Sequence, residues 1–334
     1  MPYHDTTNYQ PTFPFRNKHW STIYPSVFRK LPEVVYERER IELPDGDFID
    51  VDWSRKEGRH LVVVLHGLEG SADRPYVRGI IRVMNRAGWD GVGLNFRGCS
   101  GTPNRLPRGY HSGETGDIKF LVEKIMAEAN YETINLVGFS LGGNVTMKFL
   151  GELGNQLPAP IKRAVGISVP LDLYGSCLEI QQFHNRIYLH SFLKNLKIKT
   201  RLKEDVLRSH IDLEKVYQAK DFFQFDGAAT APLHGFGSAA EYYKKSSSLN
   251  YLPKIKIPVM LINALNDTFL SETSYPIELA KKSKNIHLVT PKYGGHVGFV
   301  TRHPENIYWT EEMVRNFFIE NTNSRRGNVF RIAS

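Results

Sequence analysis

The sequence is poor in cysteine, with only Cys99 and Cys177 among 334 residues. Two cysteines cannot build a disulfide framework, and neither belongs to a C-x-x-C or clustered Cys/His pattern typical of zinc sites. No stretch approaches about 18 consecutive apolar residues, and the first residues lack the basic region and apolar core of a secretory signal. The sequence therefore predicts neither a membrane span nor export. It predicts a reducing, cytoplasmic location and no metal or other cofactor.

Acidic residues are outnumbered, with 35 Asp and Glu against 43 Lys and Arg and a net charge of +8. Such an excess is compatible with a nucleic-acid partner, an anionic membrane surface or ordinary solvation. No RNP-like aromatic pattern, zinc-finger spacing or helix-turn-helix accompanies the charge, so we expect no nucleic-acid partner. A chain of this length with 41% hydrophobic residues can bury the core of one large α/β domain or two small ones.

Strand and helix patterns alternate along most of the chain. Residues 34–43 and 48–53 alternate like the two strands of a hairpin. Beyond them, buried strand patterns alternate with amphipathic helical ones, which is typical of a mostly parallel sheet with helices on both faces. The predicted strands of this part cover residues 61–65, 91–96, 133–139, 164–170, 257–264 and 286–290, and a closing helix is predicted around 309–318.

A serine lies at one junction between a strand pattern and a helix pattern. Residues 138–142 have the form G-x-S-x-G around Ser140. This is the signature of a nucleophile elbow, in which a strained turn exposes the serine and the flanking glycines avoid a Cβ clash. Alone the motif is weak, because a glycine-rich βα turn of a nucleotide-binding fold has a similar pattern. Ser140 is therefore a candidate nucleophile that needs support from the rest of the chain.

A serine nucleophile needs a histidine base, and the histidine needs a carboxylate that orients it. Open parallel sheets build their sites at the carboxyl ends of strands. Asp267 follows the strand predicted at 257–264, and His296 follows the strand predicted at 286–290. The order Ser, Asp, His is that of the α/β-hydrolase fold. We therefore predict Ser140, Asp267 and His296 as a catalytic triad.

Two backbone N–H groups are expected to bind the oxyanion. Leu141 directly follows the nucleophile, and Leu68 lies in the turn after the first parallel strand. For His66, in the same turn, we favour a structural role. Asp172 follows the strand predicted at 164–170 and remains an alternative to Asp267, which we prefer.

Four other reactive side chains compete less well. His111 precedes the elbow in the chain, His234 lies in a long segment without strand patterns, and His287 lies within a predicted strand. Cys99 follows a strand on the active side of the sheet, but nothing around it resembles a base. We interpret it as a small buried residue.

The long segment without strand patterns covers residues 171–252. So long an excursion in a compact domain is commonly a lid over the site. The remaining parts are an N-terminal arm at 1–33, a core at 34–170 and 253–322, and a frayed tail at 323–334. The arm is rich in proline and aromatic residues, which would be costly to leave in water, so we predict an extended chain packed on the core.

Five motifs together resemble the YheT-like subgroup of α/β-hydrolases, at residues 66–71, 95–101, 110–113, 138–144 and 231–236. Residues 17–25 resemble that subgroup's arm, except that Trp20 stands where a smaller or polar residue is expected. The likeness extends from about residue 11 to 320. It implies an α/β-hydrolase with Ser140, Asp267 and His296 as triad and a carboxylesterase or lipase-like activity. Eukaryotic relatives include acylglycerol lipases and alcohol acyltransferases.

We accordingly expect a serine esterase acting on small acyl esters of short to medium chain length. An alcohol O-acyltransferase with the same acyl-enzyme and a non-catalytic hydrolase-like binding module are the alternatives. Apolar and basic residues interleave over residues 187–203. The apolar groups are expected to close over the site and the basic ones to be solvated, so that any membrane-surface association is weak and lost at moderate salt.

Overall fold

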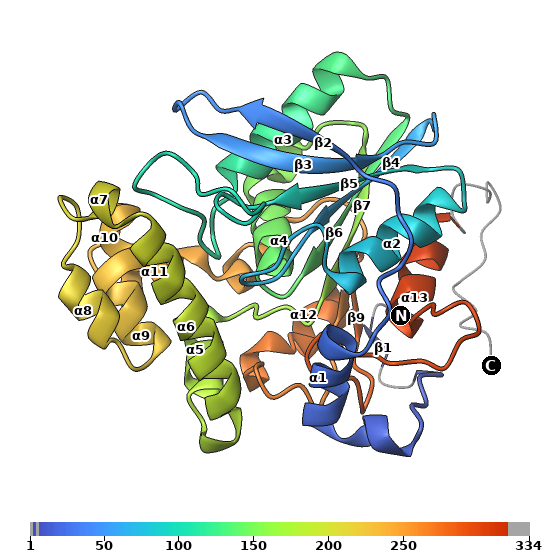
Figure 1. Ribbon diagram of the computed structural model, residues 1–334. Helices are drawn as coiled ribbons and strands as arrows, with labels where there is room; N and C mark the ends of the chain where they lie inside the picture. The colour runs from blue at the N-terminus through green and yellow to red at the C-terminus, as the bar shows by residue number, and fades with distance from the viewer. Residues whose placement is uncertain (1–2, 5–6, 320–334) are drawn as a thin grey trace.

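The computed structural model describes residues 3–4 and 7–319, so the predicted tail lies outside the described residues. Nine strands form one sheet in the order β1-β9-β8-β7-β6-β4-β5-β3-β2 (Figure 1). The strands are β1 (Tyr3–His4), β2 (Glu37–Glu42), β3 (Phe48–Ser54), β4 (His60–Leu65), β5 (Asp90–Asn95), β6 (Thr133–Phe139), β7 (Ile161–Ile167), β8 (Val259–Ile262) and β9 (Ile286–Val289). All neighbours pair in parallel except β2 with β3 and β3 with β5.

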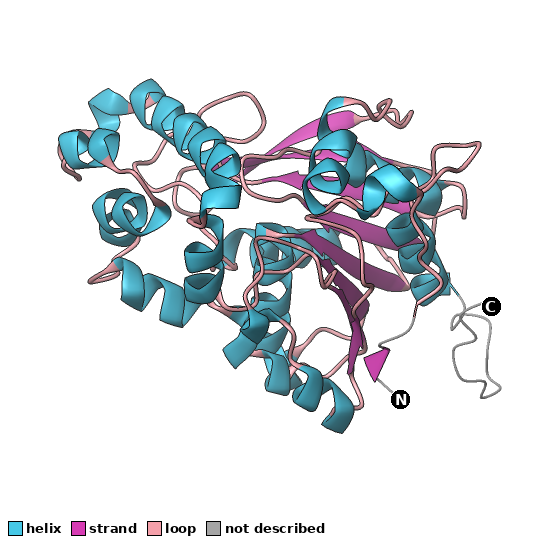
Figure 2. Ribbon diagram, turned by 90° about the horizontal axis from the view of Figure 1, so that it is seen from below, coloured by secondary structure: helices cyan, strands magenta, loops and turns pink. Residues whose placement is uncertain are grey.

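Strand β4 shows why the sheet is buried on both faces. Leu61, Val63 and Leu65 belong to one apolar cluster, and Val62 and Val64 belong to the other. Such two-sided burial is typical of a parallel sheet between helical layers, which Figure 2 shows. The first face is covered by α3 (Gly116–Glu128), α4 (Leu141–Leu153) and α12 (Ile277–Lys282), and the second by α2 (Pro75–Asn85) and α13 (Trp309–Ile319). The predicted fold class is confirmed.

Several strand boundaries differ from the prediction by one to three residues, and two of them have a clear local cause. Strand β7 ends at Ile167, three residues early, because Ser168 has a φ of +52° that an extended strand does not allow. Strand β8 begins at Val259, after Pro258 has removed a ladder donor. The apolar residues beyond each boundary are loop residues that pack in the core.

Between β7 and β8, residues 168–258 contain helices and no strand, and the structure describes all of them. We call this segment the insertion; in Figure 1 it lies beside the sheet in olive to yellow. Its helices are α5 (Leu173–Ile180), α6 (Arg186–Leu202), α7 (Glu204–Leu207), α8 (Leu213–Gln218), α9 (Phe222–Phe225), α10 (Ala231–Leu233) and α11 (Ala239–Ser246). None of the described helices has the length and apolar character needed to cross a bilayer.

The N-terminal arm is not extended as predicted, because it contains helix α1 (Lys18–Val27). The side chain of Asn17 caps this helix by accepting from the N–H groups of His19 and Trp20, a strong local signal for a helix start. Burial of its apolar groups is also incomplete: Phe15 is buried, whereas Phe13 is 83% exposed.

The arm is nevertheless attached firmly at both sides of α1. Arg29 forms a 2.6 Å ion pair with Glu311 of α13, and both side chains are only 2% exposed. Before the helix, the ring of Tyr9 packs against Phe299 and Trp309. Breaking the buried ion pair would leave an uncompensated charge, so it holds α1 in a defined place on the core.

Candidate active site

Ser140 occupies the sharp turn between β6 and α4 with a φ of +50°. A non-glycine residue seldom adopts this backbone, and the neighbours explain how it is accommodated. A Cβ on Gly138 would lie 2.3 Å from the carbonyl oxygen of Gly142, and a Cβ on Gly142 would lie 2.5 Å from that of His66. The two glycines of the motif are therefore needed for the chain to close around Ser140.

The loops after β8 and β9 bring an acid and a base to this serine. His296 Nε2 lies 2.9 Å from Ser140 Oγ, and His296 Nδ1 lies 2.9 and 3.1 Å from the two carboxylate oxygens of Asp267. One of these oxygens also accepts from the N–H of Phe269 at 2.9 Å. The Asp267 side chain is fully buried and that of His296 is 11% exposed. A buried, doubly held carboxylate fixes the imidazole so that Nε2 faces the hydroxyl.

The alternative acid has other partners. One carboxylate oxygen of Asp172 accepts from the N–H of Gly175 at 3.3 Å and so caps α5. The other accepts from the Thr273 hydroxyl at 2.8 Å. These contacts support Asp267 as the partner of His296, whereas Asp172 stabilises the start of α5.

The turn after β4 lies directly beside the elbow. A Cβ on Gly67 would approach the Cβ of Ser140 to 3.3 Å. Leu68 and Leu141 line the same cavity as Ser140. Within the part of the chain that the structure describes, neither of their N–H groups has a hydrogen-bond acceptor. Both remain available to an oxyanion.

His66 begins this turn and has a structural role. Its Nδ1 donates to the carbonyl oxygen of Gly67 at 2.7 Å, and its Nε2 accepts from the N–H of Phe96 at 3.2 Å. Complete burial lowers the pKa of His66 to about 3, so the ring stays neutral.

The same turn is held from the insertion by an ion pair. Lys199 Nζ of α6 lies 2.9 Å from Glu69, whose side chain is 5% exposed. The Tyr110 hydroxyl donates to the Glu69 carboxylate at 2.7 Å and accepts from the Glu69 N–H at 3.0 Å. Glu69 has a φ of +55°, an unfavourable backbone that these contacts stabilise. Glu69 directly follows Leu68. The insertion, by holding Glu69, therefore also helps to hold the proposed oxyanion site.

Cys99 and His287 do not compete with the triad. Burial raises the pKa of the Cys99 thiol despite Lys199 Nζ at 3.0 Å, so the thiolate nucleophile is disfavoured. His287 lies in β9 with its ring against Phe317, on the side of α13.

A cavity of about 1160 Å³ opens at Ser140 and His296 and extends under the insertion. Its walls are largely apolar and include Leu173, Ile180, Phe192, Leu196, Phe225 and Phe269. A nucleophile at the end of an apolar cavity is suited to a substrate with a reactive carbonyl and an apolar tail.

Comparison with known proteins decides the family. The profile described as alpha/beta hydrolase fold matches residues 60–302. The chain belongs to the α/β-hydrolase family. This hydrolase is 34% identical over 309 residues to the candidate esterase YheT of Escherichia coli, across 90% of this chain and 89% of that protein. It is 27% identical to phospholipase ABHD3 of Mus musculus, across 88% and 74% of the two chains.

Two further relatives extend the picture. The monoacylglycerol lipase of Saccharomyces cerevisiae is 28% identical over 285 residues, across 81% of this hydrolase and 61% of that protein. Among solved structures, the Pyrococcus furiosus esterase Pf2001 superposes with a TM-score of 0.60 at 18% identity, across 87% and 98% of the two chains. At that identity the likeness concerns the fold alone.

Helix α1 lies outside the matched range of this α/β-hydrolase, yet it holds the histidine loop. The Thr22 hydroxyl accepts from the N–H of His296 at 2.9 Å, and the Ser21 hydroxyl donates to the carbonyl oxygen of Gly294 at 2.8 Å. A Cβ on Gly298 would lie 2.3 Å from the carbonyl oxygen of Ser21. No sequence pattern marks Ser21 or Thr22 as functional, and only the resemblance of the arm motif at 17–25 singles out this segment.

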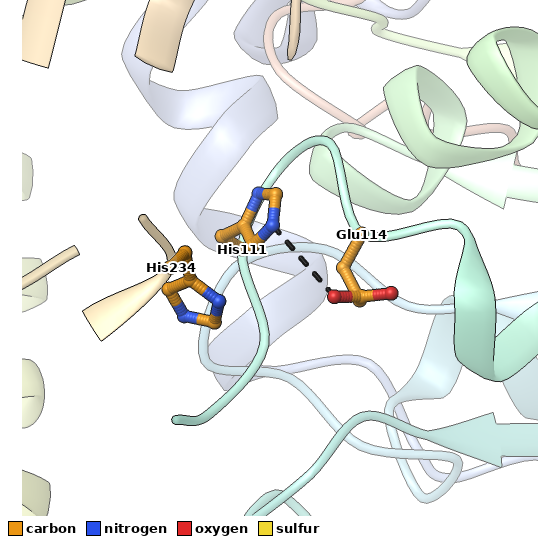
Figure 3. A group of neighbouring side chains, drawn as sticks. All are labelled: His111, Glu114 and His234. Carbon is orange, nitrogen blue, oxygen red and sulfur yellow. Dashed lines mark ion pairs between the residues drawn. The ribbon is translucent and has the colours of Figure 1, made fainter. Parts of the chain in front are cut away.

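Figure 3 shows His111, Glu114 and His234, which meet where the loop before α3 contacts the insertion. Their ligand atoms lie within 4.8 Å of one another, and two histidines with a carboxylate are a common metal donor set. However, the Gly113 N–H donates to His111 Nδ1 at 3.1 Å, so the ring proton lies on Nε2, which faces Glu114 at 3.7 Å. A metal-bound imidazole instead donates its second N–H to an acceptor. The cluster therefore fits a contact between core and insertion better than a metal site.

Proposed function

We propose that this α/β-hydrolase is a serine esterase that cleaves carboxylic esters through an acyl-enzyme on Ser140. The observation that carries the proposal is the continuous contact from Ser140 Oγ through His296 to Asp267 at the end of an apolar cavity. A binding module without chemistry has no physical need for this alignment. The names of the relatives, which include a phospholipase and a monoacylglycerol lipase, support the same reaction class.

In the proposed reaction, His296 Nε2 takes the proton of Ser140 as the hydroxyl oxygen attacks the ester carbonyl. The N–H groups of Leu68 and Leu141 bind the oxyanion that forms. The imidazolium, stabilised by Asp267, then gives its proton to the leaving alcohol. Water, activated by the same imidazole, releases the acid and restores the serine.

The proposed substrates are esters of short and medium acyl chains. A volume of about 1160 Å³ leaves room for more, since typical ligand pockets hold about 300–1,000 Å³. The apolar walls are interrupted by polar side chains, among them Asp226, His234 and Tyr243. The Asp226 carboxylate accepts from the hydroxyls of Tyr243 and Thr230, so these groups are fixed in the wall. A long acyl chain would have to lie against them and displace any water from their remaining polar surface, which is unfavourable.

Ser140→Ala tests the proposal. The substitution should lower kcat by about 10⁶ and abolish labelling by a fluorophosphonate probe, because it removes a group used in the chemical step. Ser209→Ala, at an exposed serine of the insertion, is the matched control and should change neither. Esterase activity that survives in Ser140→Ala would rule the assignment out.

The same assay measures the preferred acyl-chain length and tests whether water or an alcohol accepts the acyl group. Rates on p-nitrophenyl esters from acetate to palmitate should peak at short to medium chains. Adding an alcohol should leave the acid as the main product if water is the natural acceptor. A dominant ester product would instead show an acyltransferase that uses the same acyl-enzyme.

A further inference from the structure

Helix α1 has an unusual distribution of side chains between its two faces. The inner face, against the histidine loop, carries small or polar groups: Ser21 is fully buried and Pro25 is buried. The adjoining face turns to solvent; we call it the outer face of α1, and it consists of Trp20, Val27, the half-buried Tyr24 and the C-cap residue Phe28. An ordinary surface helix has the reverse arrangement, with its apolar stripe toward the core.

The outer face is aromatic and exposed to solvent. Trp20, Val27 and Phe28 are 39%, 64% and 56% exposed. The rings of Trp20, Tyr24 and Phe28 lie 5.4–5.9 Å from one another, so they form one patch and not scattered residues. A contiguous exposed apolar patch of this kind marks an interaction surface.

This patch lies beside the active-site cavity. Thr22, Ile23 and Ser26 of the same helix line the cavity. At its start, His19 joins α1 to the insertion, with its Nδ1 3.2 Å from the Tyr188 hydroxyl. The insertion adds two more exposed apolar side chains next to this junction, Phe183 (82%) and Ile187 (79%).

The charge of both segments has one sign. Residues 7–32 contain four Lys or Arg and no Asp or Glu, and residues 180–203 contain six Lys or Arg and no Asp or Glu. Arg29 and Lys199 are paired with Glu311 and Glu69 of other segments, which leaves eight basic side chains for an anionic partner. Basic groups around exposed aromatic rings are typical of helices that lie in the surface of an anionic lipid layer. Aromatic side chains suit that location because they combine a large apolar body with polar edges.

We propose that the outer face of α1 docks the protein onto an anionic lipid–water interface next to the opening of the cavity. The inference rests on the proposed function, since an acyl ester with an apolar tail is concentrated in such an interface. The sequence of the insertion alone predicts only weak membrane association that is lost at moderate salt, and the docking proposal differs from that expectation. Apolar contact by the outer face is not screened, so part of the binding persists at high salt.

Trp20 makes the docking directly measurable. The chain has four tryptophans, all within the described residues, and the other three, Trp53, Trp89 and Trp309, are at most 5% exposed. Vesicles of phosphatidylcholine and phosphatidylglycerol should therefore shift the fluorescence to shorter wavelength through Trp20 alone. Trp20→Phe should remove the shift while the protein still floats with the vesicles.

Affinity is tested with a second variant in the Ser140→Ala background, where no lipid is hydrolysed. The double substitution Trp20→Ser and Phe28→Ser should lower vesicle partitioning by about tenfold or more. The matched control is Phe223→Ser, which replaces an aromatic residue of α9 that is 43% exposed, and it should change little. For the unsubstituted outer face, about 0.5 M salt should weaken binding severalfold without abolishing it.

Three results would overturn the docking proposal. They are the absence of a spectral shift, equal flotation of the double variant and its parent, and a lipid-free dimer that the double substitution dissociates. The last would make the outer face a contact between two copies. With Ser140 restored, the double variant should hydrolyse dissolved p-nitrophenyl acetate within about twofold of the unmodified protein, which shows that it folds. If the unmodified protein showed no esterase activity at all, the proposed function would be refuted, while the vesicle result would still stand.

Discussion

The side-chain oxygen of Thr22 accepts a 2.9 Å hydrogen bond from the backbone N–H of His296, although 274 residues separate the two in sequence. The same hydroxyl donates to the carbonyl oxygen of Lys18 at 2.7 Å, which fixes its rotamer. The N-terminal arm thus determines where the loop presents the imidazole. Small displacements of a base from its nucleophile reduce rates strongly, so this contact should matter for catalysis although Thr22 does not react.

Thr22→Val keeps the shape of the side chain and removes the acceptor. We expect kcat to fall about tenfold or more with little change in KM, and Thr22→Ser to restore most of it, because only the hydroxyl positions His296. Thr12→Val is the control, since the buried Thr12 hydroxyl has no hydrogen-bond partner among residues 3–4 and 7–319. Equal kcat values for the two valine variants would show that the hydroxyl contact has no part in positioning.

Substitution of Asp267 and substitution of Asp172 are predicted to have different effects on kcat. Asp267→Asn should lower kcat by about 10⁴, because the imidazole loses the carboxylate that orients it and stabilises its charged form. Asp172→Asn should keep kcat within about tenfold and change the free energy of unfolding by about 1 kcal/mol at most, as expected for an altered helix cap. The opposite ranking in steady-state kinetics would transfer the role of acid to Asp172.

The ion pair between insertion and turn is predicted to act on the oxyanion site. Lys199→Met leaves Glu69 buried without its cation, so the turn that carries Leu68 should loosen and kcat should fall about tenfold. Glu69→Gln should have a similar effect, and the double variant should be no worse than either single one. Lys194→Met, at an exposed lysine of the same helix, is the control. Additive losses in the double variant would mean that the two side chains act separately.

Buried neutral histidines predict acid sensitivity. Burial lowers the pKa of His66 and of His111 to about 3, whereas an unfolded histidine titrates near its ordinary value of 6.5. Between these values the unfolded state binds more protons, so stability is lost as pH falls below about 6.5. At pH 5 each histidine should reduce the free energy of unfolding by about 2 kcal/mol relative to pH 7.

Denaturant unfolding at a series of pH values measures this loss. His111→Gln should reduce the slope of the unfolding free energy against pH by the equivalent of about one bound proton. His184→Gln, at an exposed histidine, is the control and should leave the slope unchanged. An unchanged slope for His111→Gln would mean that this side chain is protonated in the folded protein.

The elements that could be predicted from sequence are those whose signal is local. An apolar run such as residues 61–65 indicates a buried strand wherever it lies, and G-x-S-x-G at a strand end indicates the elbow around Ser140. Asp267 and His296 could be placed because parallel strands end at one edge of the sheet. The structure brings these three residues into contact, while their catalytic roles stay predictions.

What could not be predicted depends on contacts between distant segments. No local pattern tells that Thr22 reaches His296, that Lys199 of the insertion pairs with Glu69, or that His111 meets His234. The arm was misjudged for a related reason. Its aromatic residues indicate burial on average, but helix α1 turns the fully buried Ser21 to the core, where the chain approaches so closely that a Cβ on Gly298 would lie 2.3 Å from the carbonyl oxygen of Ser21.

The insertion leaves the core after β7 and returns before β8, and these two strands pair with each other. Because this pairing is parallel, the insertion is the crossover connection between the two strands, and it leaves the sheet at the edge that carries the triad residues and returns at the other edge. The free energy of closing such a connection changes slowly with its length, so the insertion can change in length over evolution without moving any strand of the sheet. An exchange of this segment between relatives would be a route to new substrate preferences with the same chemistry. Such a graft would have to retain Lys199, opposite Glu69, and Asn185, whose side chain donates to the carbonyl oxygen of Thr268 at 2.7 Å beside Asp267. Laboratory chimeras designed with these two side chains kept should stay active where chimeras without them do not.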